Sequence, residues 1–219
     1  MTRWRATITG LFVRYRGVPA GAHVPLDALL DPGFMAIDVE TTGLDPRRDA
    51  LVAAAAIPFV RGVPQPGLVT LVNPGVGIPP ASTAVHGITE RDVADAPSVP
   101  EALQLVDAAC AGWLLVGHDV AFDLEVFRTA RARHAFPSVD AIALDTRRLT
   151  RVVDPHAGDS RLEAVAERLG ISAEGRHTAD GDARIAGEIL VALLPALRAR
   201  GARSVADLLR LQRATAPSD

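Results

Sequence analysis

The sequence contains no lysine, so all 23 of its basic residues are arginine. A Walker-type phosphate-binding loop and a Schiff-base enzyme both depend on a lysine, and its absence excludes both classes. The single cysteine, Cys110, cannot form an intrachain disulfide. It lies in an apolar stretch of helical pattern, where we expect a buried, inert thiol rather than a nucleophile. We therefore expect neither redox nor zinc chemistry.

The sequence also lacks an apolar run near the roughly 20 residues that span a bilayer, and it carries no secretory leader pattern. We therefore expect a cytoplasmic protein without a membrane partner. The 219 residues, 48% hydrophobic and 22% charged, suit one compact domain. The net charge of −3 gives no overall indication of nucleic-acid binding. The oligomeric state has no signal in the sequence.

Three segments divide the chain. Residues 1–33 are predicted to form an arginine-rich amphipathic segment with a connector, 34–200 the main domain, and 201–219 a short helix and tail. In the first segment, apolar residues at helical spacing form one stripe: Trp4, Ile8, Leu11, Phe12 and Tyr15. Two interpretations stay open for this stripe. It packs on the domain, or it forms an arm that binds a partner, a nucleic acid or a membrane surface.

The main domain has the pattern of an α/β protein. Strands are predicted at 34–41, 50–60 and 68–73, and the short turns between them indicate an antiparallel meander. Further strands at 112–118 and 140–145 alternate with helices at 119–134, 160–170 and 179–200, and a last helix begins at 204. Thr89, Ser98 with Glu101, and Ser160 with Glu163 are predicted helix N-caps. We expect a mixed sheet of about five strands flanked by helices, with the two later strands parallel to the first.

Two acids interrupt the first apolar strand. Asp38 and Glu40 are two positions apart, so both side chains lie on the same side of the strand. Two buried like charges are costly unless a cation neutralises them, and a divalent metal is the usual solution. Metal binding and an exposed strand end are both compatible with this spacing. The following Thr41, Thr42 and Gly43 provide a turn that a ligand can approach closely.

Two more groups of polar residues lie at the starts of helices. Asp123 follows the strand at 112–118, and it is either a metal ligand or an acid that stabilises a helix N-terminus. His177 lies in a loop, and Asp182 follows just inside the last long helix. A loop histidine can accept a proton from water, although an isolated one is also common surface decoration.

Taken together, these motifs resemble the DEDDh exonucleases of the DnaQ-like family over residues 34–197. The resemblance rests on Asp38-x-Glu40 with its Thr-Thr-Gly turn, His118 to Asp123, and His177 with Asp182. It is extended by similar segments at 85–89, 145–146 and 162–170. It implies a ribonuclease-H-like fold and removal of nucleotides from 3′ ends.

The resemblance also implies residue roles. Asp38, Glu40 and Asp182 would hold an ion that activates water, Asp38 would bridge to a second ion, and Asp123 would bind directly or through water. His177 would be the general base. Four carboxylates without cysteine select Mg²⁺ or Mn²⁺, and two ions per site suit phosphodiester hydrolysis.

The resemblance also implies residues that contact the substrate, and the sequence departs from the family pattern in the second and third motifs. The turn of Thr41, Thr42 and Gly43, together with His86 and Phe122, is expected to contact the terminal nucleotide; His86 as an ordinary loop residue and Phe122 as core stay open. Asp119 stands where relatives commonly carry asparagine, and it is also a possible helix N-cap. Asp180 is an alternative acid in the third motif.

The sequence therefore predicts a 3′-to-5′ exonuclease acting on single-stranded DNA or RNA ends, with a DNA polymerase as a possible partner. Two alternatives remain. One is an inactive or weakly active nucleic-acid binding or polymerase-associated module, and the other is an RNA-trimming or oligoribonuclease-type enzyme. Fold analogy alone does not choose among these.

Overall fold

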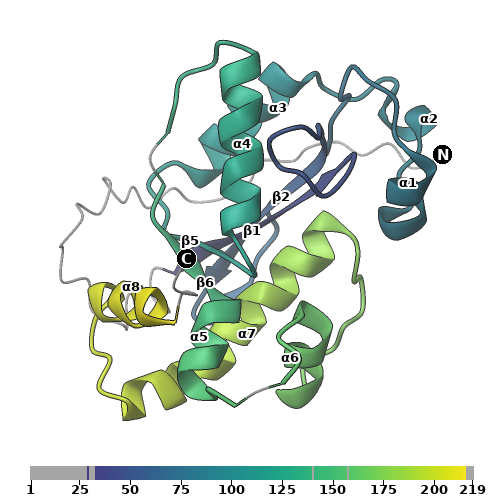
Figure 1. Ribbon diagram of the computed structural model, residues 1–219. Helices are drawn as coiled ribbons and strands as arrows, with labels where there is room; N and C mark the ends of the chain where they lie inside the picture. The colour runs from purple at the N-terminus through teal and green to yellow at the C-terminus, as the bar shows by residue number, and fades with distance from the viewer. Residues whose placement is uncertain (1–28, 30–32, 140, 157, 216–219) are drawn as a thin grey trace.

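The computed structural model describes residue 29 and residues 33–139, 141–156 and 158–215. A six-stranded sheet forms the centre of the molecule (Figure 1). β1 (Phe34–Thr41) pairs antiparallel with β2 (Leu51–Val60), and the other edge of β2 pairs with β3 (Val63–Pro64) and β4 (Leu68–Leu71). The expected antiparallel meander is confirmed, and β3 is a short additional strand.

Two parallel strands complete the sheet. β5 (Leu115–Gly117) and β6 (Ala143–Asp145) follow β1 in the spatial order β3-β2-β1-β5-β6. Both run parallel to β1, as predicted, although each is shorter than the expected segment. The carboxyl ends of β1, β5 and β6 therefore meet at one edge of the sheet, where open α/β sheets form their ligand sites.

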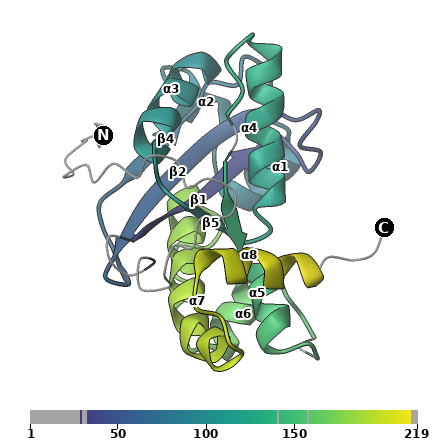
Figure 2. The same cartoon turned by 90° about the vertical axis from the view of Figure 1, so that its left-hand side faces the viewer.

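Helices cover both faces of the sheet (Figures 1 and 2). α3 (Val99–Cys110) and α4 (Ala121–Arg133) lie on one face, and α5 (Thr146–Val153), α6 (Leu162–Arg168) and α7 (Ala179–Ala199) lie on the other. α8 (Val205–Ala214) packs against α5 and β6. Two short helices, α1 (Pro80–His86) and α2 (Glu90–Val93), connect β4 to α3.

The alternation of side chains along β1 decides which face receives its acids. Phe34 and Ala36 belong to the hydrophobic core shared with α7, whereas Met35 and Ile37 belong to the core shared with α3 and α4. Asp38 is two residues beyond Ala36 and therefore continues the row that faces α7. The strand period thus directs the acids of β1 toward the beginning of α7.

Three helices begin at residues whose side chains form N-terminal caps, and two of these caps were predicted from the sequence. Thr89 caps α2 together with Asp92, and Ser98 caps α3 together with Glu101, each pair forming a capping box as predicted for the second. Ser204 caps α8, and its hydroxyl accepts the Asp207 N–H at 3.2 Å. These caps satisfy backbone groups that a helix end otherwise leaves unpaired.

The predicted cap at Ser160 is wrong. Arg161 is the N-cap residue of α6, and it makes no side-chain cap hydrogen bond. The Ser160 hydroxyl instead accepts hydrogen bonds from Arg147 at 3.0 Å and Arg151 at 3.2 Å. Two guanidinium donors from α5 therefore occupy the oxygen that would have capped the helix, and Glu163 is free to pair elsewhere.

The exposed edge of β6 is covered by one side chain of α8. Gln212 accepts the Asp145 N–H at 2.9 Å and donates to the Ala143 carbonyl oxygen at 3.0 Å. The amide thereby takes the place of a neighbouring strand and protects the edge. No helix in the described part of the chain is long and apolar enough to cross a membrane. The amphipathic helix expected within residues 1–26 lies outside the described residues.

Candidate active site

Three predicted acids come together at the carboxyl end of β1. Asp38 and Glu40 project from the strand, and Asp182 projects from the first turn of α7. One carboxylate oxygen from each lies within 4.8 Å of the others. The alternation of β1 and the start of α7 thus bring residues more than 140 positions apart in the sequence into one cluster.

Asp123, the fourth predicted acid, reaches the same strand from the opposite face. β5 pairs with β1 only at Met35 and Ala36, so the N–H of Val39 has no partner from β5. Asp123 Oδ1 accepts this N–H at 3.0 Å. Gly117 permits the close packing of this region, because a Cβ there would lie 2.8 Å from Val120 and 3.3 Å from the Ile37 carbonyl oxygen.

Burial and mutual repulsion make the acidic cluster unfavourable in its charged form. Burial, followed by the charges of Asp123, Asp182 and Glu40, raises the pKa of Asp38 well above its usual range. Burial and the charge of Asp182 raise the pKa of Glu40 to about 7. Burial also raises the pKa of Asp123 and of Asp182. A cation that neutralised these groups would therefore stabilise the folded protein.

The chemistry of the cluster fits a hard divalent cation. All of its side-chain donors are carboxylate oxygens, which are the ligands that Mg²⁺ and Mn²⁺ prefer. The separation within 4.8 Å allows Asp38, Glu40 and Asp182 to contact a shared ion. The oxygens of Asp123 lie outside that group of three, although its charge is one of those that act on Asp38.

His177 lies at the rim of this cluster with an exposed side chain. Its backbone N–H donates to Asp182 Oδ1 at 3.2 Å, and its φ of +66° is in the left-handed region that non-glycine residues rarely adopt. Such backbone strain is typical of functional positions, where surrounding contacts maintain it. The predicted base is therefore adjacent to the acids, whereas the alternative acid Asp180 is exposed and has no place in the cluster of three.

The predicted substrate turn is tightly held. The Thr41 hydroxyl donates to the Gly43 carbonyl oxygen at 2.5 Å, and the Thr42 hydroxyl accepts the Ala50 N–H at 2.9 Å. Ser82 of α1 donates to the Thr42 carbonyl oxygen at 2.7 Å. Both threonine side chains therefore stabilise the turn, and the N–H and carbonyl oxygen of Thr42 both have partners within the protein.

His86 is buried beside this turn at the end of α1. Its Nδ1 accepts the Ile88 N–H at 3.0 Å, so the ring proton of the neutral form resides on Nε2. That Nε2 is buried and has no hydrogen-bond partner among the described residues. Burial lowers the pKa of His86, and the nearby Thr41 backbone opposes this effect. The imidazole is thus a donor next to the predicted substrate turn, with the Thr41 backbone nearby but no hydrogen bond of good geometry at Nε2.

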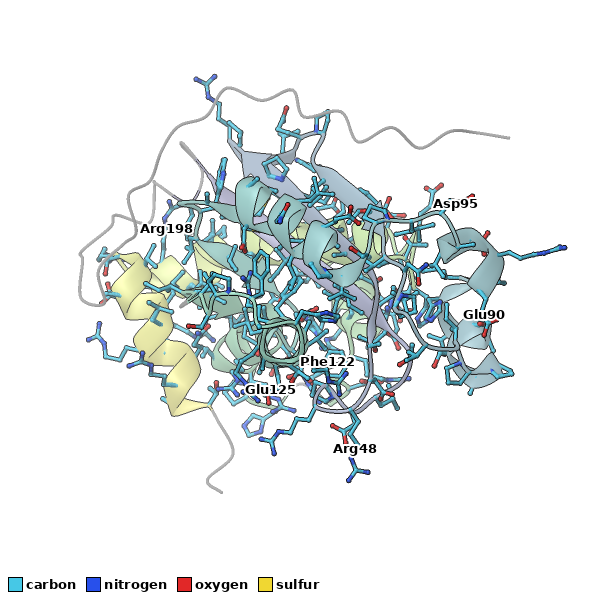
Figure 3. The ribbon with its side chains drawn as sticks, turned by 90° about the horizontal axis from the view of Figure 1, so that it is seen from above. Arg48, Glu90, Asp95, Phe122, Glu125 and Arg198 are labelled. Carbon is cyan, nitrogen blue, oxygen red and sulfur yellow. The ribbon has the colours of Figure 1, made fainter. Side chains whose placement is uncertain are left out.

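Phe122 precedes Asp123 on α4 (Figure 3). The residue is half-buried. Its ring packs against the core beneath α3 and α4 while part of it stays accessible. The structure therefore combines the two interpretations that the sequence left open. Part of this residue is accessible one position before Asp123 in the sequence.

The second motif differs in detail from its expected arrangement. Val120, not Asp119, is the N-cap of α4, because Asp119 adopts a left-handed φ of +65° and its N–H donates to Asp145 Oδ1 at 3.1 Å. The Asp119 carboxylate pairs with Arg147 at 2.7 Å. This ion pair neutralises the negative charge that Asp119 adds at a position where relatives commonly carry asparagine.

A profile of the RNase T family, described as exonuclease, matches residues 35–190. The chain belongs to this exonuclease family. It is thereby placed in the DnaQ-like group with a ribonuclease-H-like fold, as its motifs predicted. A DNA polymerase III subunit epsilon-like protein of Rhodobacter capsulatus is 45% identical over 190 residues, covering 84% of this chain and 26% of the relative. A PolC-type DNA polymerase III of Lacticaseibacillus paracasei is 29% identical, covering 78% of this chain and 12% of the relative.

Solved exonuclease structures share the fold. Exonuclease X in complex with 5′ overhanging duplex DNA has a TM-score of 0.63 and 23% identity, covering 80% of this chain and 97% of that chain. Exonuclease I of E. coli in complex with a dA16 oligonucleotide has a TM-score of 0.64 and 20% identity, covering 83% and 42%. This exonuclease-family chain spans about a quarter or less of the length of the two curated relatives named above.

Two residues at the site of this exonuclease-family protein were missed in the sequence. Arg176 donates to Asp182 Oδ2 and pairs with Glu163 of α6 at 3.1 Å. The only available signal was an arginine next to His177, which is indistinguishable in sequence from a solvated surface charge. Glu163 had been assigned to a helix cap, and its ion pairs with Arg176 at 3.1 Å and Arg161 at 3.3 Å became visible only in the folded chain.

Proposed function

We propose that this chain is a metal-dependent 3′-to-5′ exonuclease that removes nucleotides from single-stranded DNA or RNA ends. The observation that carries the proposal is the convergence of Asp38, Glu40 and Asp182 within 4.8 Å beside an exposed histidine. Partly buried acids with raised pKa values are costly to a fold that only binds nucleic acid. Membership of the exonuclease family supports the same chemistry.

The acids are proposed to hold two Mg²⁺ or Mn²⁺ ions. Asp38, Glu40 and Asp182 would share one ion, Asp38 would also serve the second, and Asp123 would complete that second position directly or through water. Bound divalent ions supply positive charge opposite the phosphate oxygens and make a water molecule easier to deprotonate. Burial and the charge of Asp182 raise the pKa of Glu40 to about 7, and a bound ion would favour the ionised form of this carboxyl group.

His177 is proposed to accept the proton of the attacking water. Its exposed imidazole is accessible to solvent, and the hydrogen bond from its backbone to Asp182 keeps the loop beside the acids. The water oxygen would form a bond to phosphorus while the bond from phosphorus to the 3′ oxygen of the preceding nucleotide breaks, and that oxygen would take up a proton from solvent. A positioned proton acceptor of this kind contributes about 10²–10⁴-fold to a rate.

The terminal nucleotide is proposed to lie along the turn of Thr41, Thr42 and Gly43. His86 Nε2 has a buried proton donor without a partner, which a sugar or phosphate oxygen of the substrate would satisfy. The accessible part of Phe122 would contact the base or the sugar. Substrate selection would then depend on these neutral groups, while the acids carry out the hydrolysis.

The single-stranded substrate and the polymerase partner are inferred from similarity. Exonuclease I was solved with a dA16 oligonucleotide, and the R. capsulatus relative is named as a polymerase III subunit epsilon-like protein. We propose that this chain acts on comparable strands and associates with a DNA polymerase. Its cytoplasmic location stays a prediction from composition.

The proposal is tested with 5′-labelled single-stranded DNA and RNA oligomers of identical sequence. The purified protein is incubated with each in Mg²⁺, in Mn²⁺ or in chelator, beside Asp38→Asn. We expect a ladder that shortens from the 3′ end in the presence of metal, with no product from the variant. The relative rates on the two strands give the sugar preference and separate a DNA-directed enzyme from an RNA-trimming one.

Other results of this assay would favour a different function for the chain. Tight binding of either oligomer without degradation would favour the nucleic-acid binding module. Cleavage at internal positions would contradict the exonuclease assignment. Equal turnover by Asp38→Asn would place the reaction outside the acidic cluster.

A further inference from the structure

Arg176 lies between two carboxylates on neighbouring helices. Its Nη1 donates to Asp182 Oδ2, while Nε and Nη2 donate to Glu163 Oε2 at 3.2 and 3.1 Å. The side chain is 24% exposed. One guanidinium is thus shared between an acid of the site and an acid outside it.

The positive charge of Arg176 reduces the electrostatic repulsion among the three acids. Burial and neighbouring charges raise the pKa of Asp38 and of Glu40, and the charge of Arg176 acts in the opposite direction on both. It also counteracts the effect of burial on the pKa of Asp182. Its influence therefore extends over the whole cluster and not only over the carboxylate that it contacts.

The loop that carries Arg176 is fixed against the first turn of α7. A Cβ on Gly181 would lie 1.9 Å from the Gly175 carbonyl oxygen, so glycine is required at this contact. The Thr178 hydroxyl donates to the same carbonyl oxygen at 2.7 Å and accepts the Gly181 N–H at 3.2 Å. The backbone next to Arg176 is therefore held in place, and the guanidinium contacts Asp182 and Glu163 from this fixed loop.

The Asp182 carboxylate has two competing partners, a guanidinium and a divalent cation. It is bound by a guanidinium in this structure, and the same carboxylate belongs to the group of three that fits a divalent cation. A guanidinium and a metal ion cannot occupy the same lone pairs at once. Glu163 provides a second anion that can retain the arginine after it leaves Asp182.

We propose that Arg176 is the resident counter-ion of the metal site, holding Asp182 when no divalent cation is bound and yielding that carboxylate to the cation while Glu163 retains it. The inference rests on the proposed function, because it requires the acids to bind metal. Arg176 is accordingly a positioning residue. It stabilises the metal-free site and lowers the affinity of that site for metal.

The test measures Mn²⁺ binding without nucleic acid, from the electron paramagnetic resonance signal of free Mn²⁺. Arg176→Gln removes the competing cation, and we expect it to bind Mn²⁺ roughly tenfold more tightly, the equivalent of one lost charge-assisted hydrogen bond. Arg176→Lys restores affinity toward the wild-type value. Glu163→Gln leaves the guanidinium with Asp182 as its remaining carboxylate partner, so Mn²⁺ binding weakens.

Thermal unfolding supplies a second readout. In chelator, Arg176→Gln is expected to lower Tm by roughly 2–4 °C relative to wild type, and saturating Mn²⁺ should remove this difference. Arg210→Gln is the matched control, because Arg210 lies on α8 and pairs there with Asp207. It should leave Mn²⁺ affinity unchanged.

Unchanged or weaker Mn²⁺ binding by Arg176→Gln would overturn the inference. If that variant does not fold, Glu163→Gln decides the question: weaker binding supports the exchange of partners, and unchanged binding refutes it. A wild-type protein that binds no Mn²⁺ contradicts the proposed function itself. That result is distinguishable from failure of the counter-ion role, in which wild type binds and Arg176→Gln has the same affinity.

Discussion

Glu40→Gln is predicted to stabilise the metal-free protein at pH 8 while eliminating its activity. Burial and the charge of Asp182 raise the pKa of Glu40 from 4.5 to about 7. Each unit of pKa corresponds to about 1.36 kcal/mol, so the ionised carboxylate costs the fold about 3 kcal/mol. Glutamine resembles the protonated acid in shape and carries no charge, and it avoids this cost.

The dependence on pH has a defined sign. Between about pH 4.5 and 7 the folded protein binds more protons at Glu40 than the unfolded chain does. The contribution of this group to stability is therefore complete below pH 4.5 and declines as pH rises toward 7. The advantage of Glu40→Gln should appear at pH 8 and vanish near pH 4.

Urea unfolding in chelator at both pH values measures this difference. The matched control is Glu167→Gln, at an exposed position of α6, which should change stability little at either pH. In saturating Mg²⁺ the order should reverse, because the wild-type carboxylate then binds the ion. A Glu40→Gln protein that is less stable than wild type in chelator at pH 8, or equally shifted at both pH values, would refute the reasoning.

Two further predictions concern the histidines. His177→Ala should lower kcat by about 10²–10⁴-fold with Mn²⁺ affinity retained, because a proton acceptor is lost and no ligand is; loss of Mn²⁺ binding would show that His177 is a ligand instead. His86→Ala should raise KM roughly 3–10-fold with a small effect on kcat, because the unpartnered Nε2 donor is removed from the substrate turn. An unchanged KM on both DNA and RNA would remove His86 from the substrate site.

Periodicity and motif spacing predicted those parts of the structure that depend on residues close together in the sequence. The strand period placed Asp38 and Glu40 on one side of β1, and the parallel direction of β5 and β6 followed from the handedness of their connections. The capping box at Ser98 was predictable because its partner Glu101 lies three residues away. Local chemistry of this kind is present in the sequence itself.

Contacts between segments that lie far apart in the sequence could not be predicted from it. Ser160 has the sequence of a helix cap, yet guanidinium groups from α5 occupy its hydroxyl. Asp123 has the sequence of a helix-start acid, and its bond to the Val39 N–H exists only because β5 ends its pairing with β1 early. Arg176 has no motif at all. Each of these roles depends on which side chains the fold brings together.

The most direct test of the account uses a single-stranded oligomer labelled on its 3′-terminal nucleotide. Wild-type protein in Mg²⁺ is expected to release the label as a mononucleotide from the earliest time point. No release is expected in chelator or by Asp38→Asn. Release of the label in longer fragments, or equal release by Asp38→Asn, would contradict the assignment of this acidic cluster as the centre of a metal-dependent 3′-to-5′ exonuclease.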